Sequence, residues 1–590
     1  MIRDTRTVKP GGEAEASPRP SRGPLAALVP GVGVARSYRR EWLRRDVVAG
    51  LVLTALLVPQ GMAYAELAGL PPVTGLYATV VPLLAYAVFG PSRILVLGPD
   101  SALAPLVAAA VIPVAGADPA ERVAVAGLLA VIVGVLLLVG AVARLGFLTD
   151  LLSKPVRLGY LAGIALIVIA DQLPRLLGVP SAGGRFVEDV GDFAGSLGEI
   201  DPTTAALGIG CLAVVLVGWR IAPGAPWILF AVAGAAILVA VLDLDVAVVG
   251  AVPGGLPALT IPSPSIDDLG RLTLGGAAIA LLAFADTSVL SRSYASRLGD
   301  RVDQSHELGG LAVANLATGL FQGFPISSSS SRTPVAEAAG SRTQLTGVVA
   351  AATVGLLLVV GTGLLKDIPT AALAAVVIAA VIRLIDVPAL RWLLRVNRGD
   401  FALAIASFVG VLLLGILPGV GFAVALSVIA VLERAWHPYT AVLGRVPALK
   451  GYHDTQRHPE GTQVPGLLLF RFDAPLFFAN AEVFRDRLHK ALDAERRAVS
   501  TVVVAAEPIT DVDSTAAEVL EEIDAELERR GIELAFAELK GPVKDTLRRY
   551  GLMARIGEDR FYPTIGLAVR AHVAEHGVDW RDWEDHREKR

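Results

Sequence analysis

Two stretches, each an extended segment followed by a short apolar one, decide the fold of this chain. The first is Arg93-Ile-Leu-Val-Leu-Gly-Pro-Asp100, followed by Ser101-Ala-Leu-Ala-Pro-Leu-Val-Ala. The second is Gly323-Phe-Pro-Ile-Ser-Ser-Ser-Ser-Ser-Arg332, followed by Thr333-Pro-Val-Ala-Glu-Ala-Ala. Neither apolar piece is long enough to span a bilayer. Each is therefore predicted to begin inside the membrane with free backbone N–H groups at its tip, and two such tips form a place for an anion.

The rest of the chain has the composition of a polytopic membrane protein. Of its 590 residues 54% are hydrophobic, and apolar runs of spanning length recur from about residue 47 to residue 435. The single cysteine, Cys211, excludes a disulfide within the chain and a thiolate metal site. The sequence contains no Gly-x-x-x-x-Gly-Lys-Ser/Thr phosphate loop, and the net charge of -4 gives no sign of nucleic-acid binding. We expect no metal, no cofactor, no nucleic-acid partner and no ATP-driven pumping.

Apolar blocks and the breakers between them predict seven membrane segments in each half of the chain. In the first half they are 47–65, 72–89, 101–113, 122–143, 156–172, 203–219 and 226–248. In the second half they are 273–292, 307–321, 332–340, 344–364, 370–384, 401–416 and 418–435. The third member is short in both halves. Because the first half contains an odd number of segments, the second half enters the membrane with the opposite orientation to the first. The sequence therefore predicts an inverted repeat, with its halves at 46–250 and 271–435.

The remaining parts of the chain are predicted to be cytoplasmic. Lys and Arg recur at alternate loops, one of them around Arg157, which places both termini in the cytoplasm of a multi-pass protein of the cell membrane. Residues 1–45 are polar and predict a disordered arm, and residues 436–465 are expected to be a linker. Strand-like runs and amphipathic helical patterns over 466–575 predict a small α/β domain, followed by a charged tail at 576–590.

The polar residues of the second tip are all hydrogen-bond donors that suit an oxyanion. They are the hydroxyls of the run from Ser327 to Ser331 and the guanidinium of Arg332. An arginine inside a bilayer is costly unless it functions or is paired, so we interpret Arg332 as a substrate ligand, with a structural salt bridge as the alternative. At the first tip, Asp100 and Ser101 are expected to cap the short helix, and Asp100 is in addition a candidate selectivity or proton-linked group.

Other membrane segments contribute further candidate residues. Gln60 and Tyr64 lie one helical turn apart and share a face, so both can donate to an oxyanion or serve as packing contacts. Asp286 lies in an otherwise apolar segment and must be protonated, paired or bound to a cation. A proton or Na⁺ at this carboxyl group would link anion uptake to a membrane gradient. Glu307, near the start of the next segment, is expected to be interfacial.

Several of these motifs together resemble those of the sulfate permease (SulP) family. The matching segments are 46–77, Gly90-Pro-Ser-Arg93, Gly98-Pro-Asp100, 304–315 and Gly323-Phe-Pro325. The C-terminal segments Arg471-Phe-Asp-Ala-Pro-Leu-Phe-Phe-Ala-Asn480 and Asp513-Ser-Thr resemble the STAS domain of that family. The matches cover nearly all of residues 40–575 and are specific as a set.

The resemblance implies a polytopic α-helical fold of fourteen transmembrane segments in two inverted repeats, arranged as a core and a gate, with a cytoplasmic α/β STAS domain and dimeric assembly. It implies an anion site between the third and tenth segments. The residues it assigns to that site are Gln60, Tyr64, Pro99, Asp100, Ser101, Ser329, Ser330, Ser331 and Arg332. Asp286 corresponds to the acid of the eighth segment, and Thr287 offers a further oxygen. The position of a Na⁺-binding threonine in bicarbonate-transporting relatives is Leu290 here, which favours H⁺ over Na⁺ as the coupling ion.

We therefore expect a secondary active transporter that takes up an inorganic oxyanion, sulfate first, together with protons. The alternatives are a bicarbonate or dicarboxylate carrier, Na⁺-coupled or not, and a membrane-anchored STAS regulator that does not transport. No nucleophile and base fall together in the sequence, so we do not expect an enzyme. Ser514 begins a predicted helix and is either a phosphorylation site that governs a cytosolic partner or part of a plain helix cap.

Overall fold

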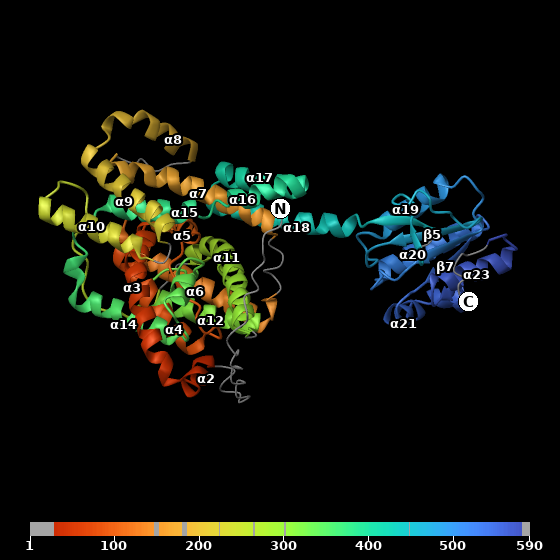
Figure 1. Cartoon of the computed structure of the whole chain (residues 1–590), viewed down its shortest axis with the longest axis horizontal. Helices are drawn as coiled ribbons and strands as arrows, with labels where there is room; N and C mark the ends of the chain where they lie inside the picture. The colour runs from red at the N-terminus through yellow and green to blue at the C-terminus, as the bar shows by residue number, and fades with distance from the viewer. Residues whose placement is uncertain are drawn as a thin grey trace, which may run out of the picture. The chain divides into compact units, whose positions relative to one another are not determined.

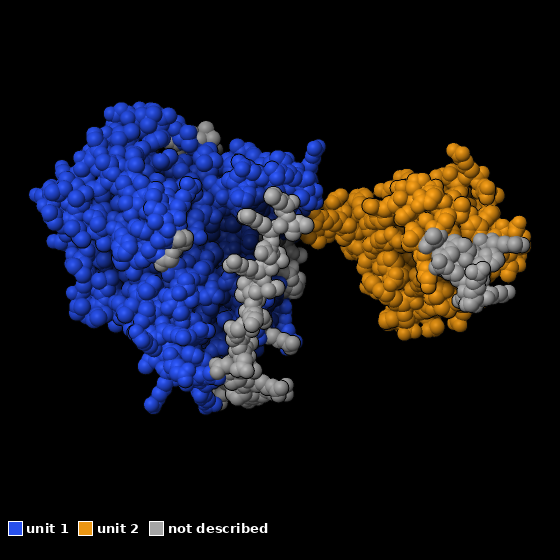
Figure 2. All heavy atoms as spheres, in the orientation of Figure 1, with its two compact units in different colours: residues 1–428 blue, residues 429–590 orange. Residues whose placement is uncertain are grey.

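The computed structural model describes residues 29–146, 153–179, 186–222, 225–262, 266–299, 302–447 and 449–580. It contains two compact units, Met1–Val428 and Ile429–Arg590, which are coloured separately in Figure 2. The boundary between them falls within helix α18 (Ile416–Trp436). Unit 1 consists almost entirely of helices, whereas unit 2 is built around a six-stranded sheet.

Each of the fourteen predicted apolar segments falls on a helix. The helices of the first half are α3 (Arg40–Leu67), α4 (Pro72–Phe89), α5 (Ala104–Ala115), α6 (Pro119–Val142), α7 (Lys154–Leu177), α9 (Pro202–Ile221) and α10 (Trp227–Leu242). Those of the second half are α11 (Ile266–Leu298), α12 (Gln304–Leu320), α13 (Arg332–Ala338), α14 (Leu345–Val360), α15 (Thr370–Ile382), α17 (Arg398–Leu414) and α18. Within the described ranges, 8 helices are long and apolar enough to cross a membrane. The total of fourteen crossings therefore stays a prediction.

Three further helices of unit 1 were not predicted, namely α2 (Pro30–Arg36), α8 (Phe186–Gly195) and α16 (Val387–Val396). The expected disordered arm at 1–45 is wrong for its described part, because α2 and the first turn of α3 are helical there. Pro30 stands in the first turn of α2, where its missing N–H costs nothing. Residues 1–28 lie outside the described residues.

The helices of unit 1 pack in two groups (Figure 1). In one group, α7 packs against α9, α15 and α17, and α10 packs against α9. In the other, α6 packs against α12, α11 and α5, and α3 packs against α4 and α14. Small residues allow close approaches between these helices, since a Cβ added at Gly75 of α4 would lie 1.8 Å from the carbonyl oxygen of Gly61 of α3. The two groups agree with the core and gate arrangement that the family resemblance implies.

The two extended segments that precede the short helices pair with each other. Strand β1 (Leu97–Gly98) runs antiparallel to β2 (Ser327–Ser328), with Leu97 opposite Ser328. The backbone N–H of Ser328 also donates to Oγ1 of Thr287 on α11, at 3.3 Å. Backbone groups that are neither helical nor solvated need such partners inside a membrane. The pairing places the starts of α5 and α13 next to each other, as the sequence predicted.

Unit 2 contains a six-stranded sheet in the order β4-β3-β5-β6-β7-β8. Its strands are β3 (Thr440–Arg445), β4 (Tyr452–Asp454), β5 (Leu467–Phe472), β6 (Thr501–Ala505), β7 (Glu533–Ala537) and β8 (Phe561–Tyr562). Strands β5 to β8 are parallel, whereas β3 pairs antiparallel with both β5 and β4. The predicted linker at 436–465 is therefore wrong, because two strands of the sheet lie within it.

Alternate side chains of β5 enter two hydrophobic cores on opposite faces of the sheet. Leu468, Phe470 and Phe472 contribute to one core, and Leu467 and Leu469 to the other. Helices α19 (Ala481–Ala494), α20 (Ser514–Arg529), α21 (Gly541–Arg549) and α22 (Leu552–Ile556) supply the first core, and α23 (Ile565–His576) supplies the second. The strands and helices from β5 to α23 match the strand-like runs and amphipathic helical patterns that the sequence showed over 466–575.

Candidate functional site

A cavity of about 370 Å³ in unit 1 lies where the two short helices begin. Its wall combines residues from both helix groups. The polar and charged lining residues are Gln60, Tyr64, Asp100, Ser101, Arg157, Asp286, Ser328, Ser330, Ser331, Arg383 and Asp386. The apolar part of the wall includes Trp219, Leu161 and Leu290. The cavity is thus rich in hydrogen-bonding groups although it lies among apolar helices.

Seven of the predicted site residues line this cavity, and four do not. Those in the lining are Gln60, Tyr64, Asp100, Ser101, Asp286, Ser330 and Ser331. Pro99, Ser329, Thr287 and Arg332 are buried just behind the wall. Thr287 accepts the hydrogen bond from β2 described above, which gives it a structural contact. The assignment of any of these residues to a bound ion remains a prediction.

Arg332 stands out because its guanidinium is buried without a hydrogen-bond partner among the described residues. Its exposed fraction is 0%, and Nε, Nη1 and Nη2 have no hydrogen-bond partner among the residues that the structure describes. The guanidinium lies against Gly98 of β1, where an added Cβ would come within 2.8 Å of Nη1. Asp100 and Tyr64 are its electrostatic neighbours. The expected alternative of a structural salt bridge is absent from the described ion pairs, and a role of Arg332 in binding substrate remains a prediction.

The serine run divides into residues that build the turn and residues that face the cavity. Oγ of Ser329 accepts the backbone N–H of Arg332 at 3.3 Å and lies 3.0 Å from Oγ of Ser331. Oγ of Ser328 is buried, and no group in the described ranges bonds to it. Helix α13 has only 7 residues, so its dipole is small compared with the full charge of Arg332. The guanidinium is therefore the main positive charge at this tip.

The first tip differs in detail from the predicted cap. Helix α5 begins at Ala104, and its N-cap is Leu103, which makes no side-chain cap. Oδ1 of Asp100 accepts the backbone N–H of Ala102 at 2.9 Å, within the turn that precedes the helix. Nearby, Oε1 of Gln60 is buried and has no partner within the described part of the chain. Asp100 thus stabilises the turn rather than the helix, and Gln60 retains an unused amide oxygen.

Asp286 is paired, which is one of the three states the sequence allowed. Its Oδ1 lies 3.7 Å from Nη1 of Arg157 on α7. The sequence counted Arg157 among the cations at the cytoplasmic end of the predicted segment 156–172, and the structure places it in the first turn of α7 and in the cavity wall. Arg383 is a second cationic lining residue that the sequence did not indicate, and its guanidinium stacks on the ring of Trp219 at 5.1 Å. Both arginines lie on helical turns close to loops, so the sequence did not indicate that they line the cavity.

The expected interfacial position of Glu307 is wrong. Its exposed fraction is 0%, and its carboxylate accepts hydrogen bonds from the hydroxyl of Tyr86 and, at 2.7 Å, from Oγ of Ser92. Nε2 of Gln344 donates at 2.8 Å to the carbonyl oxygen of Ser92 and so holds that residue in place. Glu307 therefore connects α12 to α4 and lies apart from the cavity.

A second, larger cavity of about 680 Å³ adjoins the first. Four residues, Gln60, Trp219, Ser331 and Arg383, line both. The charged residues in its lining are Arg220 and Arg383, with no carboxylate among the described lining residues. A cavity with walls of one sign raises the local concentration of the opposite charge. The larger cavity therefore favours the approach of anions to the smaller one.

In unit 2, Ser514 occupies the first position of α20 and is exposed. The cap of this helix is Asp513, whose Oδ1 accepts the backbone N–H of Ala516 at 2.8 Å. Its Oδ2 accepts the N–H of Phe478 at 2.8 Å. The capping role predicted for the Asp-Ser pair thus belongs to Asp513, and phosphorylation of Ser514 remains a prediction.

Comparison with known proteins identifies two families along the chain. Residues 43–407 match the Sulfate permease family, and residues 458–568 match the STAS domain. The sequence is 44% identical to a probable sulfate transporter of Mycobacterium tuberculosis, over 92% of this chain and 98% of that one. It is 32% identical to the chloroplastic sulfate transporter 4.1 of Arabidopsis thaliana, over 91% of this chain and 81% of that one.

Solved structures share the fold. Murine Solute Carrier 26 family member A9, an anion transporter solved in the inward-facing state, matches with a TM-score of 0.86 and 20% identity over 95% of this chain and 96% of that one. The transmembrane domain of a cyanobacterium bicarbonate transporter matches with a TM-score of 0.58 and 23% identity over 67% of this chain and 98% of that one. Since the family match covers well over half of the sequence, the chain belongs to the sulfate permease family, with a C-terminal STAS domain.

Proposed function

We propose that this protein is a secondary active anion transporter that takes up sulfate with protons by alternating access. The observation that carries the proposal is the buried guanidinium of Arg332, which has no partner in the described ranges. An unpaired charge in a membrane segment is costly and is retained where it acts on a substrate. A doubly charged oxyanion close to Arg332 would satisfy both its charge and its hydrogen bonds.

The cavity wall supports an oxyanion rather than an apolar solute. Hydroxyl groups of Ser101, Ser330 and Ser331 line it together with Tyr64, and each can donate one hydrogen bond. The relatives with the highest identities given above are named sulfate transporters, which is why sulfate ranks first. The bicarbonate transporter shares only the fold at 23% identity, so its substrate carries less weight.

Asp286 is the proposed proton-binding group of the transport cycle. It lines the cavity close to the anion site, and its side chain is 25% exposed. Protonation would release its contact with Arg157 and leave a net positive charge beside the anion. The neighbouring Leu290 offers no oxygen to Na⁺, so a proton is the favoured coupling ion.

Movement of one helix group against the other is the proposed mechanism of access. The cavity lies between the two groups, so a shift of one would open it to opposite sides of the membrane in turn. We further propose a homodimer in the cytoplasmic membrane with both termini and the STAS domain in the cytoplasm, where the domain would meet a regulatory partner. The alternation of cationic loops supports this orientation.

Uptake of labelled sulfate into proteoliposomes tests the proposal. With an inward proton gradient, the wild-type protein is expected to accumulate sulfate above the level of empty liposomes, and Arg332→Gln is expected to show none. Arg297→Gln is the matched control, because Arg297 is an exposed arginine of α11 that pairs with Glu337 at 3.0 Å. Accumulation by Arg332→Gln at the wild-type rate would overturn the site.

The same liposomes separate the alternative functions. Bicarbonate, fumarate and sulfate are each added as competitors of labelled sulfate, and the true substrate is expected to inhibit at the lowest concentration. A Na⁺ gradient in place of the proton gradient tests the coupling ion. Absence of flux for every anion would favour the membrane-anchored STAS regulator.

A further inference from the structure

The ion pair between Arg157 and Asp286 is the starting point of this inference. Nη1 of Arg157 lies 3.7 Å from Oδ1 of Asp286, and the two side chains are 29% and 25% exposed. Both residues line the 370 Å³ cavity. A carboxylate in an apolar helix needs a compensating positive charge, and this chain supplies that charge from its own arginine.

The two partners belong to different helix groups. Arg157 lies in the first turn of α7, which packs against α15, α17 and α9. Asp286 lies in the middle of α11, which packs against α6, α5 and β2. The ion pair therefore crosses the interface that must rearrange if the groups move against each other.

The surroundings of the pair are polar on the α7 side. Tyr160 follows Arg157 by one helical turn, and its buried hydroxyl has no hydrogen-bond partner in the described part of the structure. The other charged residues in the cavity wall are Asp100, Arg383 and Asp386. Asp386 is used in part as a helix cap, since its Oδ1 accepts the N–H of Ala389 at 2.9 Å. Carboxylates thus outnumber arginines in the wall by three to two, and loss of Arg157 would leave a site rich in negative charge.

We propose that Arg157 is a tethered counter-cation, occupying the place that a free metal cation would otherwise take beside Asp286. The assignment rests on the proposed transport function and deepens it by explaining how this chain does without Na⁺. As a positioning residue, Arg157 holds the carboxylate ready for protonation while excluding small cations. Oxygen ligands for Na⁺ remain nearby, because Asp100 and Asp286 line the same cavity.

Replacement of Arg157 tests the proposal. In the Arg157→Gln protein the carboxylate of Asp286 loses its counter-charge, and sulfate uptake is expected to become at least about tenfold faster in Na⁺ than in N-methylglucamine buffer. The wild type and Arg157→Lys are expected to differ less than about twofold between the two buffers. The double variant Arg157→Gln/Asp286→Asn is expected to lose the response to Na⁺. Uptake by Arg157→Gln that is equal in both buffers would overturn the proposal.

A second measurement does not depend on transport. The purified full-length protein in detergent is heated with either Na⁺ or N-methylglucamine at equal ionic strength. A ligand that binds the folded state raises the Tm, so Na⁺ is expected to raise the Tm of Arg157→Gln by at least about 2 °C. It should leave the wild type and the double variant unchanged. Equal melting of Arg157→Gln in both salts contradicts a vacated cation site, even if the proposed transport of sulfate proves wrong.

Discussion

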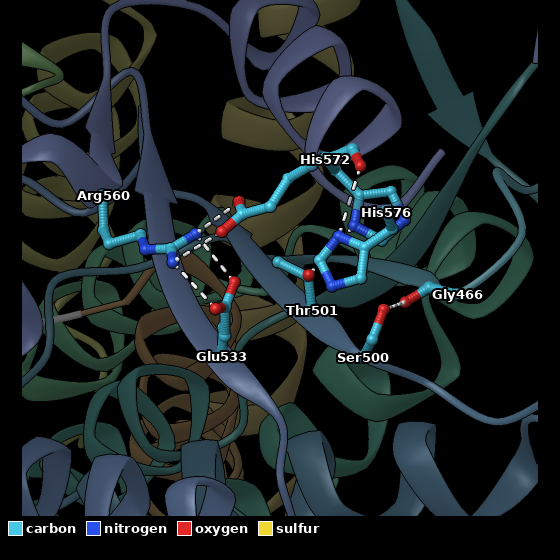
Figure 3. A network of polar contacts seen from close by, with 8 residues as sticks. Gly466, Ser500, Thr501, Glu533, Arg560, His572 and His576 are labelled. Atoms are coloured by element: carbon cyan, nitrogen blue, oxygen red, sulfur yellow. Dashed lines mark hydrogen bonds and ion pairs between the residues drawn. The ribbon is translucent and has the colours of Figure 1, made fainter. Parts of the chain in front are cut away.

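Two arginines of this chain, one in each unit, have opposite environments. Arg332 of unit 1 is fully buried, and the described residues offer its guanidinium no hydrogen bond. Arg560 of unit 2 is held by two carboxylates: its Nη1 lies 2.7 Å from Oε2 of Glu533 and 3.0 Å from Oε2 of Glu575. Figure 3 shows Arg560 beside Glu533, with the rings of His572 and His576, which stack on each other, nearby.

The contrast shows how the surroundings of a charge indicate its role. A fully paired arginine has no donors left for a ligand, and its contribution is to stability. A buried arginine without a partner destabilises the empty protein and gains when an anion arrives. The paired arginine, Arg560, joins β7 to α23 in unit 2, whereas Arg332 lies at the point where β1 and β2 meet. Substitution of Arg332 should therefore reduce transport without lowering stability. Substitution of Arg560 should lower stability and leave transport unchanged.

The largest effect is expected from Arg332→Gln. Removal of the charge should reduce sulfate uptake at least about a hundredfold, because the anion loses a charge-assisted contact in a buried site. The Tm of the empty protein should stay the same or rise, because no protein partner loses a bond. Proteoliposome uptake and a melting curve on one preparation measure both. A large drop in Tm would show that Arg332 is a structural residue.

Gly98→Ala should have the next largest effect on transport. Its φ of +149° is unfavourable for other residues, and the added Cβ would lie 2.8 Å from Nη1 of Arg332. We expect uptake to fall about tenfold or more, because the added Cβ displaces the guanidinium and small displacements of a binding group have effects of this size. Gly421→Ala is the control, since a Cβ there meets no atom within 4 Å. Equal uptake by both variants would show that transport does not depend on the close contact between Gly98 and Arg332.

Arg560→Gln should act on stability and leave transport chemistry intact. Both Glu533 and Glu575 would lose their charge-assisted bonds, and unit 2 should be destabilised by about 1–2 kcal/mol. Hydrogen exchange in the full-length protein is the measurement, with faster exchange expected in β7 and α23. Arg548→Gln is the matched control, because its ion pairs with Asp545 and Glu558 are more exposed. Unchanged exchange in Arg560→Gln would show that the network contributes nothing.

The smallest effect concerns pH and His572. Burial lowers the pKa of His572 below its ordinary value of 6.5, although the carbonyl of Pro465, which bonds to Nε2 at 3.1 Å, opposes the change. The folded state therefore binds this proton less tightly than the unfolded chain does. Its contribution to stability is complete above about pH 6.5 and declines as the pH falls. The protection factors of the α23 amides, which correct the exchange rates for the pH dependence of unprotected amides, should fall by less than about tenfold between pH 7.5 and 5.5.

His572→Gln separates this effect from the titration of other groups. Gln retains hydrogen-bonding atoms for Thr501 but does not take up a proton in this range. The pH dependence of the protection factors at α23 should therefore flatten in the variant. An identical pH response in both proteins would assign the dependence to another residue.

Much of the architecture followed from local sequence. The apolar segments, their matching order and the two short members predicted a repeat, and the structure places a helix on every one. The residues from Gly98 to Ser101 and the serine run predicted that the two tips would meet, and β1 pairs with β2. These predictions held because segment length and turn-forming residues act over a few neighbours in the chain.

What only the tertiary structure decided was the partner of each charge. Arg157 was counted as a cation that sets the orientation and is paired with Asp286, whereas Glu307 was expected at an interface and is buried against Tyr86 and Ser92. Strands β3 and β4 were likewise missed in the predicted linker, because whether a short segment forms a strand depends on the strands that pair with it. The sequence alone determined which groups carry charge and where helices break. Whether Arg157 and Glu307 have partners depends on residues more than a hundred positions away, and no local pattern encodes that distance.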